Sequence, residues 1–215
     1  TAFKSFSSLG DVFNSSGPLL IVPAGFVMNA ITDRTDKMRI EGTLQTKNQN
    51  DSWADFKASS GGIEVASGGL FTTGDDRGSS FAYNLRFEAN SSVTGGALRS
   101  RSYYNYIGTT NKPTTFTQSG GVFEVAAGYN LTEGYLYVQN GSRYEQSGGT
   151  FSVARDVQLS NASRYVVSGG TATIGDELIL SAAGDTYQQS GGTVTIANIR
   201  GRSGSRLDIT GGSLT

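Results

Sequence analysis

The amino-acid sequence predicts an all-β fold, a single-stranded parallel β-helix solenoid of the right-handed form with coils of about 21 residues. The first observation is a phrase that occurs five times in the second half of the chain: an aromatic residue or Leu, two further residues, Ser or Thr, and Gly-Gly. The second is that the residues after each Gly-Gly alternate between apolar and polar types, the period of a β-strand. Units this short cannot bury their own apolar face, so they must stack on their neighbours.

The five copies span 116–125, 144–153, 165–174, 187–196 and 207–215. Stacked coils place equivalent residues about 4.8 Å apart, the spacing of paired strands. We therefore expect a structural ladder inside the coils, formed by Phe116, Tyr144, Tyr165, Tyr187 and Leu207. In the strand that follows, Phe151 and Val153 should also point inward while Ser152 faces solvent.

Each Gly pair marks a corner at which one strand ends and the next begins. A bend this tight needs a positive φ or a close approach of two backbones, and a Cβ atom opposes both. The expected corner glycines are Gly120, Gly121, Gly148, Gly149, Gly169, Gly170, Gly191, Gly192, Gly211 and Gly212.

A second apolar pair follows in each unit and predicts a further strand. Tyr135 and Tyr137 occupy the place that Val157 and Leu159 hold in the next unit, so this alignment predicts that both rings point inward. A third short strand precedes each Gly-Gly. Three strands per unit, separated by Gly and polar corners, are typical of a parallel β-helix.

The coils are expected to continue through the less regular first half, so that the chain forms one domain. We divide it into an N-terminal arm or cap over 1–17, irregular coils over 18–115 and regular repeats over 116–215. Longer loops are expected at 47–56, 73–80 and 101–115. Strand-like runs occupy 26–31, 38–46, 62–65, 70–73, 81–87 and 97–99. The alternative folds are a β-sandwich or a β-propeller, but propeller blades repeat over about twice this length.

The longest apolar stretch, 18–31, is interrupted by Pro23 and Gly25 and is shorter than a membrane-spanning helix requires. We expect one or two buried strands there, and no membrane insertion.

Composition removes several classes of chemistry. The chain has 17 Lys and Arg against 18 Asp and Glu, a net charge of -1, with no block of like charge, so it offers no electrostatic surface for nucleic acid. It contains no Cys and no His, which excludes disulfides, thiolate zinc sites and Ser-His-Asp hydrolysis. We expect no cofactor and no metal site.

Acidic pairs are the remaining candidates for acid–base catalysis. They are Asp75 with Asp76 and Asp176 with Glu177. Adjacent strand residues point to opposite faces, so neither pair is by itself a two-carboxylate site, and the neighbouring glycines indicate solvated turns. No catalytic residue is assigned and no enzyme is expected, with a polysaccharide lyase or glycoside hydrolase as the enzyme alternative.

Aromatic residues raise a separate possibility. Tyr103, Tyr104 and Tyr106, together with Trp53, offer ring faces on which sugars can stack. Packing in the core or in a loop is the more common role of such rings.

The phrase Ser-Gly-Gly-Thr followed by a Val or Ile strand occurs within 146–153 and 189–196. It resembles repeats of secreted bacterial β-helical proteins, including autotransporter passenger domains and large surface-exposed proteins. This resemblance covers about 116–215 and implies an extracellular or cell-surface location. Proteins of this kind include adhesins, structural proteins and some enzymes, so the fold leaves the activity open. A chain that opens Thr1-Ala2-Phe3 is expected to be a mature form after signal removal, with a fragment as the alternative.

The fifth copy of the phrase stops inside its last strand, with no helix or charged segment after it. An uncovered coil presents unpaired backbone groups to another chain, so we expect copies to join head to tail into an extracellular fibre, filament or surface layer. A truncated chain, or a following domain, is the alternative. The candidate self-assembly residues are Leu19, Leu20, Ile21, Val22, Phe26, Val27, Ile209 and Leu214. The alternative function is a surface adhesin, or a β-helix that binds or degrades an extracellular polysaccharide.

Overall fold

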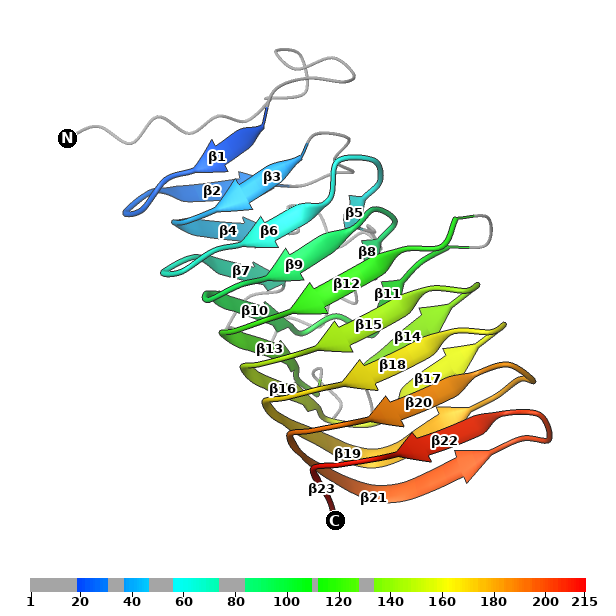
Figure 1. Cartoon of the computed structure of the whole chain (residues 1–215). Coiled ribbons are helices and arrows are strands. Elements are labelled where there is room, and N and C mark those ends of the chain that lie inside the picture. Colours follow the sequence, from blue (N-terminus) through cyan, green and yellow to red (C-terminus); the bar gives the residue numbers. More distant parts are fainter. Residues whose placement is uncertain (1–18, 31–36, 47–55, 74–83, 110–111, 128–133) are drawn as a thin grey trace.

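The computed structural model describes residues 19–30, 37–46, 56–73, 84–109, 112–127 and 134–215. Every regular element in these ranges is a β-strand, and the paired strands run parallel. The chain winds through stacked coils around one long axis (Figure 1). The prediction of an all-β, parallel β-helix is therefore confirmed.

The described strands lie on three faces; the coils from β3 to β21 contribute a strand to each face, whereas the coils of β1 and β22 contribute described strands to the first two only. The first face is a nine-stranded sheet made of β1 (Leu20–Val22), β3 (Met38–Ile40), β6 (Ile63–Val65), β9 (Ser91–Val93), β12 (Thr115–Gln118), β15 (Arg143–Gln146), β18 (Arg164–Val167), β20 (Thr186–Gln189) and β22 (Arg206–Ile209).

The second face follows the first after one corner. It consists of β2 (Val27–Ala30), β4 (Thr43–Thr46), β7 (Leu70–Thr73), β10 (Ala97–Ser100), β13 (Val122–Val125), β16 (Thr150–Val153), the first part of β19 (Thr171–Leu180), the first part of β21 (Thr193–Gly201), and β23 (Ser213–Leu214).

The third face closes the coil. It consists of β5 (Phe56–Ala58), β8 (Leu85–Phe87), β11 (Tyr104–Ile107), β14 (Tyr135–Gln139), β17 (Val157–Ser160) and the second parts of β19 and β21. Because β19 and β21 continue from the second face into the third, the two faces form one 14-stranded sheet.

The core is the interior of the coils. Strand registers place Phe116, Tyr144, Tyr165, Tyr187 and Leu207 in one column, and all but Leu207 are fully buried. Phe123 and Phe151 stack in the facing column of the second face, and Tyr144 contacts both Phe123 and Phe151 edge-on. The coils thus share a single continuous hydrophobic core rather than separate ones.

The glycine pairs lie at the corner between the first and second faces. The second glycine of a pair has a positive φ, as Gly170 does at +81°. The first approaches the preceding coil closely, because a Cβ on Gly169 would lie 2.5 Å from the carbonyl oxygen of Ser147. Both members of a pair therefore approach the preceding coil closely, and only the second also needs a positive φ.

Two strand assignments from the sequence were wrong. The segment 101–115 contains β11, which pairs with β8 and β14, and is not one long loop. In β14 the buried residues are Leu136 and Val138, so Tyr135 and Tyr137 point outward. Every residue from 135 to 138 is apolar or aromatic, and the phase of the alternation could not be recognised from the sequence.

The apolar run 18–31 forms two strands, β1 and β2, but it is not buried as expected. Val22 is buried, whereas Leu19, Ile21, Phe26 and Val27 are exposed. Both strands are edges, since β1 pairs only with β3 and β2 only with β4 among the described strands. The expected arm at 1–17, and the expected loops at 47–56 and 73–80 apart from Phe56 and Thr73, lie outside the described residues.

Candidate functional surfaces

The β1 end of the solenoid carries exposed apolar side chains. Phe26 is 65% exposed and Ile21 is 48% exposed. The amide of Leu20 donates to the Lys37 carbonyl at 2.9 Å and the Val22 carbonyl accepts from Glu41 at 2.8 Å, so these two residues bond toward β3. Ile21, between them, directs its backbone groups to the open edge.

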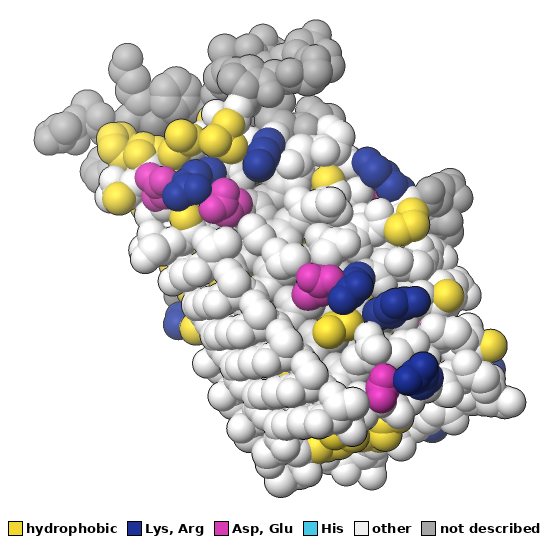
Figure 2. All heavy atoms as spheres, in the orientation of Figure 1, with side chains coloured by type: hydrophobic (Ala, Val, Ile, Leu, Met, Phe, Trp, Pro, Cys, Tyr) yellow, Lys and Arg dark blue, Asp and Glu magenta, His cyan; other side chains and the backbone are white. Residues whose placement is uncertain are grey.

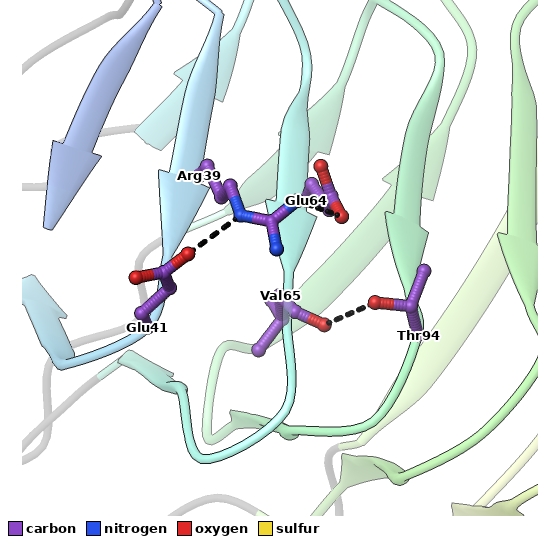
Figure 3. A network of polar contacts seen from close by, with 5 residues as sticks. All are labelled: Arg39, Glu41, Glu64, Val65 and Thr94. Carbon is purple, nitrogen blue, oxygen red and sulfur yellow. Dashed lines mark hydrogen bonds and ion pairs between the residues drawn. The ribbon is translucent and has the colours of Figure 1, made fainter. Parts of the chain in front are cut away.

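A charged cluster lies directly beside this apolar end. Ile21 pairs with Arg39 across β1 and β3, and Arg39 contacts Glu41 at 2.8 Å and Glu64 at 2.9 Å (Figure 3). The Glu41 hydrogen bond, followed by the charge of Glu64, raises the pKa of the Arg39 guanidinium. In the space-filling view the apolar side chains form a band along the end, next to these charges (Figure 2). The ion pairs hold Arg39 to Glu41, which directly follows β3, and to Glu64 of β6, so among the described residues the apolar band is the unpaired part of this end.

The β22 end is also apolar. Leu207 is 49% exposed and Ile209 is 44% exposed, although both belong to the interior columns. Leu214 of β23 is half-buried. The amides of Arg206 and Thr210 donate to the preceding coil at 2.9 and 2.8 Å, so Leu207 and Ile209 direct their backbone groups away from it.

Buried glutamines join the coils between these ends, and the sequence analysis did not identify them. The amide of Gln146 donates to the Thr171 carbonyl of the next coil at 2.9 Å, while its oxygen accepts from the Tyr165 hydroxyl at 3.1 Å. Gln118 makes the same two kinds of contact with Thr150 and Tyr144. The last coil has Leu207 and Ile209 in these columns, which makes its open side apolar.

Of the two acidic pairs, the one that the structure describes is held in ion pairs. Asp176 and Glu177 lie in strand β19, at an irregularity of its register, and not in the solvated turn that was expected. Asp176 pairs with Arg155 at 3.3 Å and Glu177 with Arg200 at 2.8 Å. Asp75 and Asp76 lie outside the described residues. Among the described residues no three acidic groups gather as a metal site would require.

Four tyrosines form an outward-facing group on the third face, which we name the tyrosine surface: Tyr104 and Tyr106 of β11, and Tyr135 and Tyr137 of β14. The register pairs Tyr104 with Tyr135 and Tyr106 with Tyr137, at ring-centroid distances of 5.9 and 5.3 Å. Tyr104 lies 5.7 Å from Tyr137 across the diagonal. Burial, followed by the neighbouring tyrosines, raises the pKa of Tyr137 to about 12, so this ring is a neutral phenol at physiological pH.

Charged groups border the tyrosine surface on both sides. On β8, the guanidinium carbon of Arg86 lies 4.5 Å from the centroid of Tyr106. On the other side a hydrogen bond with Tyr135 raises the pKa of Arg155. Tyr103 extends the group, with its ring 5.7 Å from Tyr104. Trp53, which the sequence placed with these tyrosines, lies outside the described residues.

Within the described ranges no helix is long and apolar enough to cross a membrane. Comparison of the chain with family models, with curated proteins and with solved structures found no match.

Proposed function

We propose that this chain is a structural subunit that joins copies of itself end to end into an extracellular fibre or surface layer. The observation that carries the proposal is the match between the two ends of the solenoid. In the register that continues the interior columns, the β1 end of one copy stacks on the β22 end of the next. This register places Leu20 against Leu207, Val22 against Ile209 and Met28 against Leu214.

The backbone groups at the two ends support the same register. Leu207 and Ile209 present their donors and acceptors at one open edge, and Ile21 presents its own at the other. In a parallel pair, one residue bonds with the two residues that flank its partner. Ile21 opposite Asp208 would therefore bond with Leu207 and Ile209, and all three side-chain columns would continue across the junction.

Corner length does not oppose this junction. Three residues separate β22 from β23, and four separate β1 from β2. Corners inside the chain already differ by more than this and still stack, since two residues separate β3 from β4 while four separate β6 from β7.

The two ends are different surfaces, so the contact is head to tail and repeats without closing. A filament follows from one interface alone. Its stabilisation comes from apolar burial and strand pairing and involves no catalytic group, which is why we propose a structural protein and not an enzyme. The resemblance of the Ser-Gly-Gly-Thr units to secreted bacterial β-helices is the support for an extracellular location.

The experiment compares the full chain with Ile209→Lys by sedimentation velocity and negative-stain electron microscopy over a range of protein concentrations. Ile209 is already exposed, so lysine leaves the isolated subunit folded but puts an unpaired charge into the proposed junction. We expect filaments from the natural chain and at least tenfold weaker association from the variant. Thr171→Lys, on the exposed second face, carries the same added charge and should assemble normally. Monomers of the natural chain at every concentration would rule the proposal out.

A further inference from the structure

The tyrosine surface is separate from the junction proposed above. It spans β11 and β14 in the middle of the solenoid, several coils from either end. Its side chains do not fill the core, because the alternate residues Asn105, Ile107, Leu136 and Val138 are the buried ones. Interior packing therefore does not account for four rings at these positions, and an aromatic group of this size on an outer face indicates a binding surface.

The chemistry of the group favours a ligand with an apolar face and polar edges. Neutral phenol rings offer flat faces to C–H groups, while their hydroxyls donate and accept hydrogen bonds at the rim. Gln158 of β17 is the partner of Tyr137 in the next coil and adds an amide beside the rings. Pyranose rings have this combination, with C–H groups on the ring face and hydroxyls around the edge.

Two other ligand classes fit less well. Nucleic acid also stacks on aromatic rings, but its phosphates need cations. The two cations that border the surface are already engaged, since the Arg86 guanidinium lies over the Tyr106 ring and Arg155 is paired with Asp176. A hydrocarbon surface would take phenol hydroxyls out of water and could offer them no hydrogen bond of its own.

We propose that the tyrosine surface binds a neutral polysaccharide whose sugar rings stack on Tyr104, Tyr106, Tyr135 and Tyr137 across two adjacent coils. The inference does not depend on self-assembly. It gives the solenoid a second kind of partner, an extracellular glycan held along its side while its ends remain open.

The test is isothermal titration calorimetry on the full chain with soluble neutral oligosaccharides: cellohexaose, laminarihexaose, mannohexaose and chitohexaose. Binding of at least one is expected. Each aromatic contact contributes about 0.5–1.5 kcal/mol, so Tyr104→Ala and Tyr137→Ala should each lower that affinity about 2- to 12-fold. Tyr104→Phe should keep most of it. Ile179→Ala, two coils further along the Tyr137 column, should change nothing.

Three controls separate the explanations. Thermal unfolding of each variant shows whether the loss is local, and saturation-transfer NMR should place the contact on the C–H protons of the sugar. Titration of the assembly-defective Ile209→Lys chain shows whether binding needs the filament, and we expect it does not. Absence of binding to all four oligosaccharides, equal affinity in the alanine variants, binding of oligo(dT) alone, or loss of self-association in Tyr104→Ala without any sugar binding would each overturn the proposal.

Discussion

At the scale of single residues, glycines at the corners meet two separable constraints. Gly170 has a φ of +81° and lies so close to the preceding coil that a Cβ would be 2.6 Å from the Gly149 carbonyl oxygen. Gly25 has nearly the same φ, +79°, but an added Cβ there would meet nothing within 4 Å. Comparison of Gly25 with Gly170 therefore separates the free-energy cost of a Cβ in a left-handed backbone from the cost of pushing two coils apart.

We predict that Gly25→Ala lowers the free energy of unfolding by about 1–2 kcal/mol, the cost of placing a Cβ in the left-handed region. Gly170→Ala should cost more, about 4 kcal/mol or above, because the backbone of the neighbouring coil must also move. Urea denaturation followed by circular dichroism measures both. Equal losses in the two variants would show that coil contact contributes nothing at this corner.

At the scale of strands and columns, the tyrosines of the first face combine stacking with hydrogen bonds. The rings of Tyr144 and Tyr165 lie 4.9 Å apart and nearly parallel, and Tyr165 lies 5.4 Å from Tyr187. Their hydroxyls are satisfied by the buried glutamines. A phenolate in this column would be charged inside an apolar interior, so the column is stable only while its tyrosines are protonated.

Alkaline pH should therefore destabilise the fold. Burial raises the pKa of Tyr144 and Tyr165 well above 10.0, and burial also raises that of Tyr187. Above pH 10 the unfolded chain loses these protons while the folded chain keeps them, so the free energy of unfolding falls as pH rises. Below pH 10 the three groups are protonated in both states, so they do not make the free energy of unfolding depend on pH. Each contributes a slope of about 1.4 kcal/mol per pH unit.

Urea unfolding between pH 8 and pH 12 measures this slope, which is about 4 kcal/mol per pH unit for the three tyrosines together. Tyr165→Phe should reduce it by about a third, because one titrating group has been removed. The same slope in the variant and the natural chain would mean that ionisation elsewhere controls alkaline unfolding.

Sequence reasoning worked where a strand alternates cleanly and failed where it does not. β16, with buried Phe151 and Val153 around Ser152, could be assigned from its pattern. β11 could not, because one of its two interior positions is the polar Asn105, which accepts from the Ser100 hydroxyl at 2.5 Å and donates to the Tyr135 carbonyl at 3.0 Å. A buried amide satisfied by distant partners looks like a loop residue until those partners are known.

The candidate surfaces were predictable to different degrees for the same reason. The apolar run at the β1 end stands out in the sequence, although its exposure follows only from its place at the edge of both sheets. Tyr104 and Tyr106 were named as possible sugar contacts. Tyr135 and Tyr137 were assigned to the core, so the four-ring surface emerged only when the register placed β14 beside β11.

At the scale of the whole molecule, each coil pairs only with the coils next to it, so stability is carried by nearest-neighbour interfaces. A coil with two neighbours gains two such interfaces. The coils of β1 and β22 pair with described strands on one side only. In the proposed filament a second copy supplies an interface on the other side of both, and the filament is in this sense a continuation of the fold.

This continuation specifies which residues meet, and engineered thiols can test it because the chain contains no cysteine. In the column-continuing register Ile21 of one copy lies opposite Asp208 of the next. Paired strands hold Cα atoms about 4.8 Å apart, within the disulfide range of about 4.4–6.8 Å. Under mild oxidation, Ile21→Cys/Asp208→Cys should give a ladder of covalent oligomers on a non-reducing gel. Each single variant can give dimers at most.

The control places the second thiol one coil further inside, in Ile21→Cys/Gln188→Cys. Gln188 occupies the same outward column as Asp208 and pairs with it, so it lies about one strand spacing from the open edge. A filament in the proposed register keeps the two thiols of this control out of reach of each other and should give no ladder. Equal ladders from the two double variants would indicate random collision, and dimers alone from Ile21→Cys/Asp208→Cys would show that the ends meet in another register or not at all.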